Sequence, residues 1–229
     1  MITIRKSNER GHIRHDWLDT YHTFSFGDYF DPQHTHFQTL RVVNEDRISP
    51  QTGFPFHSHQ DMEIITYIIS GVIEHQDSLG NNGQIRKGEI QLMRAGSGIT
   101  HSEVNPSDTE ETHLLQIWIF PNQKNLEPAY QQKQINLHDL PNQLLLIASP
   151  NGENNSFVIA QDAKVYACIL QDKEIQYNIS SSRSVWLQVV NGDLSVNSTA
   201  ITRGDGIAIK DETQLNISGT GEFILFDLK

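Results

Sequence analysis

The chain has 229 residues, of which 37% are hydrophobic and 20% are charged, a balance typical of a folded protein and not of a disordered one. Acidic residues outnumber basic ones by 28 to 17, and the net charge of −11 argues against nucleic acid as a partner, because phosphate backbones are bound through lysine and arginine. No apolar leader and no run of about 18 apolar residues occurs, so we expect a cytoplasmic protein without membrane spans.

Short runs of β-branched and aromatic residues recur along the chain, separated by turn residues. This alternation predicts an all-β protein. Only residues 125–134 fit one or two helical turns, at the periphery of the fold. The single cysteine, Cys168, lies in an apolar run and is predicted to be a core residue. The clearest apolar runs are residues 40–43, 63–69, 113–119, 185–190 and 223–226.

The two halves of the chain carry the same pattern. Each half reads as a strand, a turn at a glycine, a second strand, and a Gly-acid turn into a further strand, which is typical of an antiparallel sandwich or barrel. We place an N-terminal domain at residues 1–130, a connection at 131–142 and a C-terminal domain at 143–229, with an N-terminal segment shared between the two. The matching segments are residues 67–75 and 187–195, followed by 86–92 and 202–208.

Two pairs of polar residues with period two stand out in the first half. One pair is His57 and His59, and the other is His101 and Glu103. Residues i and i+2 of a β-strand point to the same face, about 6.6 Å apart along the chain, so each pair can aim two donor groups into one barrel interior. Two such strands facing each other would supply three imidazoles and one carboxylate. This donor set suits one divalent transition metal and leaves coordination positions open for water or substrate.

The expected surroundings of these groups favour a bound metal over a solvated or merely hydrogen-bonded histidine pair. Unpaired imidazoles and a bare carboxylate are costly among apolar side chains. A second carboxylate, Glu63, shares the face of His59 if the strand is unbroken, so spacing alone does not choose between Glu63 and Glu103. The other histidines carry no comparable signal, since most lie in polar segments or beside a turn, and His22 and His113 are ambiguous. The apolar residues expected around the site are Phe54, Phe56, Ile64, Ile65, Leu92 and Met93.

Longer stretches of the N-terminal half resemble the pirin family of the cupin superfamily, above all its bacterial members with quercetin 2,3-dioxygenase activity. They include the motifs GFPFHSH at residues 53–59 and GSGITHSE at residues 96–103, and their order and spacing agree. The resemblance covers most of residues 15–120. The further segments that carry it are residues 15–32, 63–67 and 71–78.

This resemblance implies an all-β fold of two stacked cupin barrels of the jelly-roll type, a bicupin. It places the metal in the first barrel only, and no histidine occurs between Val185 and Lys229 to build a second site. It also favours Glu103 as the carboxylate ligand, with Glu63 as the alternative. The implied ligand set is His57, His59, His101 and Glu103.

The activity implied by the resemblance is cleavage of a flavonol such as quercetin with dioxygen, releasing carbon monoxide. Glu103 is the predicted catalytic base, taking the proton of an acidic flavonol hydroxyl. Phe54 and Gln116 are our candidates for substrate contacts, with plain packing as the alternative role of each. Iron is the expected metal, one ion per chain, with nickel, copper, manganese, cobalt and zinc as alternatives.

Two other functions fit the same ligands. Some pirins act as metal-dependent regulators that bind a protein partner, and such a protein would keep the four ligands without needing an accessible pocket. The third hypothesis is a metal-binding domain with an unknown small substrate, for which flavonol oxidation is incidental. We expect a monomer. Flavonol turnover under air, compared with capture of a protein partner, separates the enzyme from the regulator.

Overall fold

The computed structural model describes all 229 residues, and almost all of its secondary structure is β. It contains 19 strands and three short 3-10 helices, η1 (Ser7–Glu9), η2 (Leu137–Asp139) and η3 (Glu153–Asn155). The predicted all-β class is confirmed. The helical turns predicted at residues 125–134 are wrong, because this segment supplies strand β12 (Ala129–Gln134), whose backbone pairs with β9 (Glu89–Arg94). None of the helices is long and apolar enough to span a membrane.

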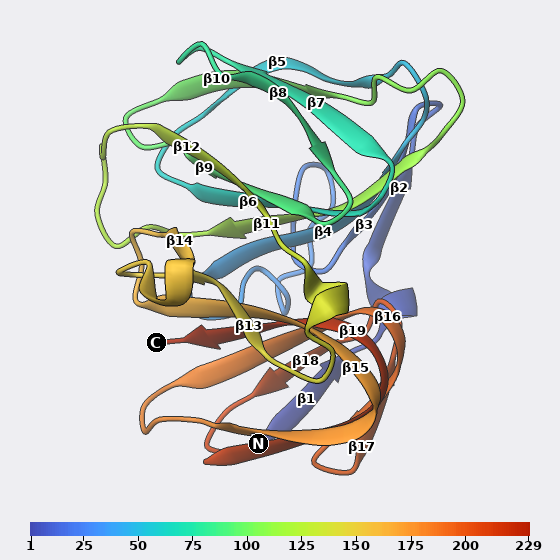
Figure 1. The fold of residues 1–229 in the computed structure, drawn as a ribbon, viewed down its shortest axis with the longest axis vertical. Helices are drawn as coiled ribbons and strands as arrows, with labels where there is room; N and C mark the ends of the chain where they lie inside the picture. Colours follow the sequence, from blue (N-terminus) through green and yellow to red (C-terminus); the bar gives the residue numbers. More distant parts are fainter. The chain divides into compact units, whose positions relative to one another are not determined.

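The chain divides into two compact units (Figure 1). The N-terminal unit consists of Gly11–His36 and Leu40–Ile135, and the C-terminal unit consists of Met1–Arg10, Phe37–Thr39 and Asn136–Lys229. The division after Ile135 lies inside the connection expected at residues 131–142. The first ten residues belong to the C-terminal unit, and the domain limits 1–130 and 143–229 stay a prediction.

The N-terminal unit is built from two antiparallel sheets. The larger sheet has the strand order β12-β9-β6-β11-β4-β3-β2, and the smaller sheet has the order β5-β10-β7-β8. Apolar side chains of both sheets, such as Ile48 and Ile73, pack into one buried cluster between them. The remaining strands of this unit are β2 (Gly11–Arg14), β3 (Leu18–His22), β4 (Leu40–Ile48), β5 (Gly53–His59), β6 (Glu63–Ser70), β7 (Val72–Asp77), β8 (Asn82–Arg86), β10 (Ile99–Val104) and β11 (Thr112–Ile119).

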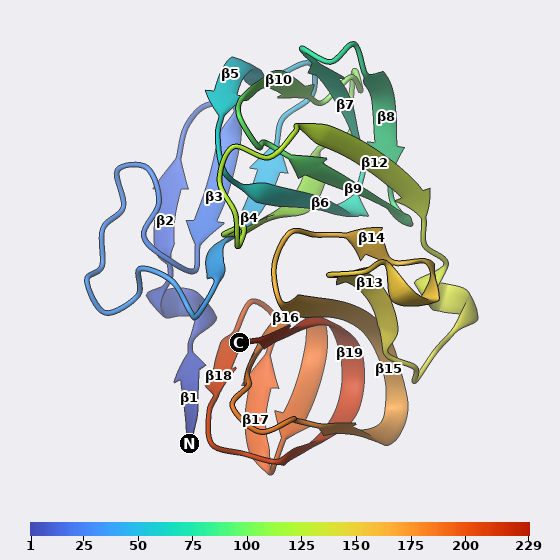
Figure 2. The same cartoon turned by 90° about the vertical axis from the view of Figure 1, so that its left-hand side faces the viewer.

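The C-terminal unit is a single eight-stranded sheet with the order β1-β18-β16-β19-β15-β13-β14, in which β17 pairs with β16. Its three longest strands bend along their length, so the sheet curls around an apolar core (Figure 2). The strands are β1 (Ile2–Arg5), β13 (Leu145–Ser149), β14 (Phe157–Val158), β15 (Ala163–Asn178), β16 (Ser184–Val196), β17 (Thr199–Thr202), β18 (Gly206–Ile209) and β19 (Gln214–Leu228).

The repeat seen in the sequence corresponds to a shared glycine conformation. Gly71, between β6 and β7, has φ +81°, and Gly192, within β16, has φ +86°. A Cβ atom at Gly192 would lie 2.2 Å from the carbonyl oxygen of Thr220, so this position has no room for a side chain. Both units therefore bend the chain with glycine at the equivalent place.

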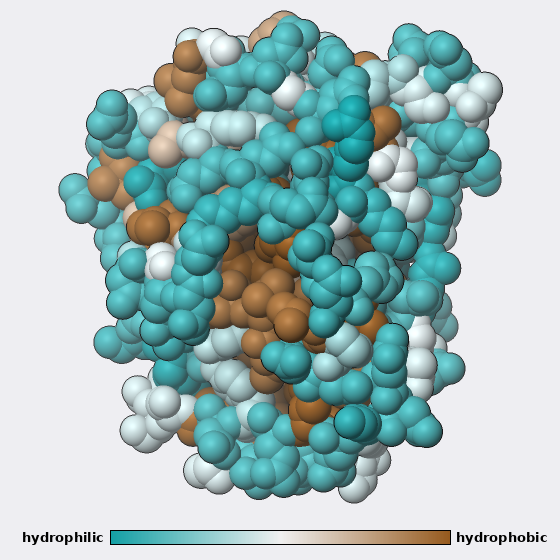
Figure 3. Space-filling view, in the orientation of Figure 1, coloured by the Kyte–Doolittle hydropathy of each residue, from teal (hydrophilic) through white to brown (hydrophobic).

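Most apolar side chains are buried in both units. Hydrophilic residues cover most of the face seen in Figure 3, in keeping with the net charge of −11. Cys168 is 0% exposed, which confirms its predicted core position. Burial raises the pKa of its thiol to about 12, so this cysteine is unreactive at neutral pH.

Candidate metal centre

Three of the predicted ligands meet on two paired strands of the smaller sheet. His57 and His59 lie on β5, and His101 lies on β10 directly opposite His57. The ring centroids are 4.5, 4.6 and 4.9 Å apart. One donor atom from each residue lies within 4.8 Å of the other two. The structure thus brings the three imidazoles together within reach of a single ion.

The protonation of these imidazoles suits a bound cation. Burial, followed by the neighbouring histidines, lowers the pKa of His59 to about 4 and that of His101 to about 3. Both rings are therefore neutral near pH 7 and keep a lone pair. The Nδ1–H of His57 donates to the carbonyl oxygen of Pro55 at 2.8 Å, which leaves Nε2 as its donor atom. Nε2 of His101 is buried without a hydrogen-bond partner, as expected for an atom that faces a metal position.

Glu103 lies two residues beyond His101 and is 2% exposed. One carboxylate oxygen accepts a hydrogen bond from the hydroxyl of Thr66 at 3.0 Å, and the other accepts one from the amide of Gln116 at 2.8 Å. A carboxylate oxygen of Glu103 also lies within 4.8 Å of donor atoms of His101 and His75. The carboxylate is thus held in one orientation next to the histidine cluster.

The competing carboxylate, Glu63, has a different partner. It begins β6 in the larger sheet, so the strand that carries His59 is not continuous with it. The Nε–H of Arg94 donates to Glu63 at 2.8 Å, and Glu63 is 0% exposed. Glu63 could share the face of His59 only if one unbroken strand contained both residues, and the structure places them on separate strands. Its position fits a structural ion pair better than a ligand.

A cavity of about 290 Å³ lies beside these ligands within the N-terminal unit. Both predicted substrate contacts, Phe54 and Gln116, line it together with His57, His59, His101 and Glu103. Of the apolar residues expected around the site, Phe54 and Ile64 are in the lining. The expectation for Phe56 is wrong, because this side chain is 60% exposed. The cavity is therefore apolar on some walls and polar next to the ligands.

A second polar group in the cavity was not predicted from the sequence. Thr20 on β3, together with Asn44 and Asp46 on β4, lines the cavity. Burial, helped by the charges of Glu103 and Glu45 and opposed by a hydrogen bond from Thr20, raises the pKa of Asp46 to about 7. Asn44 and Asp46 belong to the polar run Asn44–Arg47 of β4, so no period-two pattern distinguished them in the sequence.

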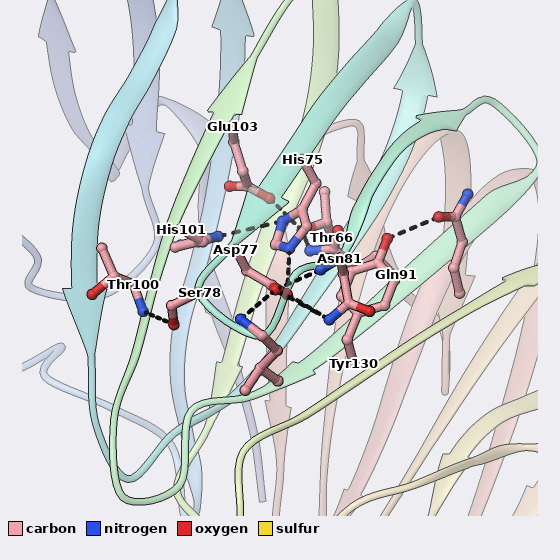
Figure 4. A network of polar contacts seen from close by, with 12 residues as sticks. Thr66, His75, Asp77, Ser78, Asn81, Gln91, Thr100, His101, Glu103 and Tyr130 are labelled. Atoms are coloured by element: carbon pink, nitrogen blue, oxygen red, sulfur yellow. Dashed lines mark hydrogen bonds and ion pairs between the residues drawn. The ribbon is translucent and has the colours of Figure 1, made fainter.

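Further polar residues, some behind the site and some in the cavity wall, were also missed. His75 was expected to lie beside a turn, but it is 0% exposed and its Nε2 lies 3.0 Å from Oδ2 of Asp77 (Figure 4). Its Nδ1 faces His101 at 3.5 Å. His15 and His22, to which no role was given, line the cavity as well. His75 and Asp77 share the period-two spacing that marked the ligand pairs, whereas the contact between His75 and His101 depends on which strands become neighbours.

Comparison with known proteins gives the same picture over the whole chain. The family described as Pirin matches residues 3–119, and the one described as Quercetinase C-terminal cupin domain matches residues 146–228. A curated protein of Escherichia coli (strain K12) named quercetin 2,3-dioxygenase is 45% identical, covering 100% of this chain and 99% of that protein. A pirin-like protein of Caulobacter vibrioides is 38% identical, covering 99% of each chain.

Solved structures agree with the sequence matches. The crystal structure of YhhW from Escherichia coli matches with a TM-score of 0.96 at 44% identity, covering 100% of this chain and 98% of that chain. The structure of bacterial pirin YhhW in complex with nickel(II), also from Escherichia coli, matches with a TM-score of 0.95 at 44% identity, covering 100% and 99%. The predicted bicupin class is confirmed by these matches. With its His and Glu cluster in the first of two cupin units, the chain belongs to the pirin family.

Proposed function

We propose that the chain is a metal-dependent dioxygenase that cleaves flavonols such as quercetin with dioxygen and releases carbon monoxide. The observation that carries the proposal is the convergence of three imidazoles and Glu103 on a cavity of about 290 Å³. This volume lies at the lower limit of small-molecule sites, about 300–1,000 Å³, and so favours a single small substrate. The name of the Escherichia coli relative supports the flavonol, and the nickel(II) complex of YhhW supports a divalent ion.

The proposed ligands are His57, His59, His101 and Glu103, holding one divalent transition metal. Iron is the ion we expect, and the mixed nitrogen and oxygen donors also accept nickel, copper, manganese, cobalt or zinc. When bound, such an ion would supply Lewis acidity toward a flavonol oxygen and a site of reaction for dioxygen. The protein contributes the arrangement of ligands, the cavity walls and the base.

Glu103 is the proposed base. Hydrogen bonds from Thr66 and Gln116 hold the plane of its carboxylate fixed. Each carboxylate oxygen has a second lone-pair site, so Glu103 can still accept the proton of a flavonol hydroxyl placed next to it. Loss of this proton makes the substrate electron-rich, which prepares it for attack by dioxygen.

The cavity walls fit a flat, polyhydroxylated aromatic substrate. Phe54 and Trp118 line the cavity, and Phe54 is braced by an edge-to-face contact with Trp17 at 5.1 Å. We propose that Phe54 packs on a substrate ring and that Gln116 contacts a substrate oxygen. Thr20 and Asp46 add hydrogen-bonding groups for further hydroxyls.

Aerobic assays of the metal-loaded protein test the proposal through loss of flavonol absorbance together with carbon monoxide release. We expect His57→Ala, His59→Ala and His101→Ala each to lose most of the bound metal and the turnover while staying folded, because ligand removal acts locally. His12→Ala is the control, since His12 contacts Asp19 on the surface and does not line the cavity. A metal-replete wild type that consumes no flavonol would reject the proposed activity.

A further inference from the structure

Three buried side chains form a chain of contacts that includes His101 (Figure 4). Nδ1 of His101 lies 3.5 Å from Nδ1 of His75, and Nε2 of His75 lies 3.0 Å from Oδ2 of Asp77. β10 and β7 pair antiparallel with His101 opposite Asp77, so the three residues share one face of the smaller sheet. The side chains of His75 and Asp77 are both 0% exposed, so no solvent competes for these contacts.

Asp77 determines where the protons lie along this chain. Its Oδ1 accepts the backbone N–H groups of Leu79 and Asn81 at 2.9 and 3.0 Å, and the side-chain amide of Asn81 donates to both oxygens. A carboxylate surrounded by donors acts only as an acceptor, so His75 donates from Nε2. A neutral imidazole protonated on Nε2 has a lone pair on Nδ1. When His75 carries only the proton on Nε2, the proton between the two imidazoles belongs to Nδ1 of His101.

This arrangement leaves the lone pair of His101 on Nε2. That atom is buried, has no hydrogen-bond partner, and belongs to the residue that groups with His57 and His59. We propose that His75 and Asp77 are positioning residues, which hold His101 as the Nδ1–H tautomer and present its Nε2 lone pair to the metal. The inference rests on the metal site of the proposed function.

Packing holds the His75 ring between His101 and Asp77. Tyr130 stacks on its ring, with centroids 4.8 Å apart and an interplanar angle of 28°. His75 also groups with His101 and Glu103 within 4.8 Å, but each of its nitrogens already faces another partner. We therefore assign His75 to orientation and not to ligation. Without His75 or Asp77, His101 could take the Nε2–H tautomer, which cannot bind a cation through that atom.

Two measurements test the role of His75 and Asp77. Long-range ¹H–¹⁵N spectra of the metal-free protein show which ring nitrogen of His101 is protonated, and we expect Nδ1 in the wild type. In His75→Leu and Asp77→Asn we expect a mixture of tautomers or the Nε2–H form. Competition of each variant with a chelator for Ni²⁺ is the second readout, and both substitutions should weaken binding by about 10- to 100-fold.

A matched control is His113→Leu, which removes another buried histidine paired with a carboxylate. His113 lies on β11, outside the chain of contacts, with its Nε2 2.9 Å from Oε1 of Glu45, and its loss should leave Ni²⁺ affinity unchanged. Asp77→Asn keeps the size of the side chain, so this variant still tests the positioning role if His75→Leu does not fold. An Nε2–H tautomer in the wild type, or unchanged Ni²⁺ affinity in folded Asp77→Asn, overturns the positioning role.

The same experiments separate this inference from the proposed activity. If the tautomer and affinity results hold but no flavonol is consumed, the dioxygenase proposal fails and the positioning role stands. If flavonol is consumed while Asp77→Asn binds Ni²⁺ as the wild type does, the positioning role fails and the activity stands. A wild type that binds neither Ni²⁺ nor any of the other proposed divalent ions rejects both.

Discussion

Two buried carboxylates in the N-terminal unit differ in their partners. Glu103 accepts hydrogen bonds from two neutral groups, Thr66 and Gln116, whereas Glu63 pairs with the cation of Arg94. A neutralising partner satisfies a buried charge, but neutral donors leave the negative charge of Glu103 available to a metal or a proton. The two residues therefore have separable effects when each is changed to glutamine.

Glu103→Gln removes a negative ligand and the base, so flavonol turnover should fall by about 10²-fold or more. Metal affinity should weaken as well. Glu63→Gln should keep the metal and most of the turnover but cost about 1–3 kcal/mol of stability, because Arg94 loses a charged acceptor. Turnover, metal content and thermal unfolding of the two variants check this. The opposite result, with metal and activity lost only in Glu63→Gln, would move the ligand to the position that general cupins use.

Asp46 makes stability depend on pH. Because its folded-state pKa is raised to about 7, folded protein keeps this proton between about pH 4 and 7 while unfolded protein has lost it. The stabilising contribution is thus complete below pH 4 and is lost as the pH rises through 7. Asp46→Asn has no proton to lose, so metal-free Asp46→Asn should gain stability relative to the wild type at pH 8, by up to about 4 kcal/mol.

Denaturant unfolding of metal-free wild type and Asp46→Asn at pH 4 and pH 8 measures this effect. The difference between the two proteins should be larger at the higher pH. Asp108→Asn serves as a control, because Asp108 is an exposed acidic residue outside the cavity. A stability difference for Asp46→Asn that is the same at both pH values would contradict the raised pKa.

At the scale of elements, the strand pair that carries the ligands contains an irregularity that the sequence does not reveal. His101 pairs with His57, but two residues later Glu103 pairs with Phe54, three residues back along β5. The extra residue in β5 is a β-bulge, and Pro55, which has no N–H for the ladder, lies within it. Beyond the bulge the alternation is reset, so Phe54 lines the cavity while Phe56 faces outward.

This bulge explains which parts of the site were predictable. Period two on a single strand was enough to pair His57 with His59. Phe54 and Phe56 have the same spacing, yet only one of them lines the cavity, because a bulge depends on the partner strand. Contacts across strands, such as that between His75 and His101, join residues 26 positions apart in the sequence and depend on the strand register, which no local pattern contains.

Gly53 tests how closely β5 and β10 must approach. A Cβ atom there would lie 2.2 Å from the carbonyl oxygen of Glu103 and 2.5 Å from Cα of Val104. Gly53→Ala must therefore push β5 away from β10 next to a ligand, and should cost about 1–3 kcal/mol and weaken Ni²⁺ binding. Gly83→Ala is the matched control in the same sheet, because its nearest neighbour would be 3.7 Å away. Equal Ni²⁺ affinity and stability in both variants would show that close approach at Gly53 is not required.

At the scale of the whole molecule, the all-β class and the two similar halves were predictable because both follow from local features, namely short apolar runs and repeated glycine turns. The unit to which the N-terminal strand belongs was not predictable. β1 pairs with β18, matching Ile2 with Ile209. A four-residue strand carries no signal that selects a partner some 200 residues away, so the sequence predicted a shared segment without showing where it pairs.

The two units share an architecture but differ in what fills their interiors. Both clusters of metal-donor residues belong to the N-terminal unit. The corresponding interior of the C-terminal unit is packed with aliphatic and aromatic side chains such as Leu187, Val189 and Phe223. These side chains offer no lone pair to a cation, and the segment from Val185 to Lys229 has no histidine.

We therefore predict a stoichiometry of one tightly bound divalent ion per chain. Metal-free protein titrated with Ni²⁺ should saturate at one equivalent by calorimetry, and elemental analysis after gel filtration should give the same ratio. A double variant, His57→Ala with His101→Ala, should bind no tight equivalent, because removing two of four ligands leaves no site. Two tight equivalents in the wild type, or one that survives in the double variant, would mean that donors outside the four proposed residues hold an ion.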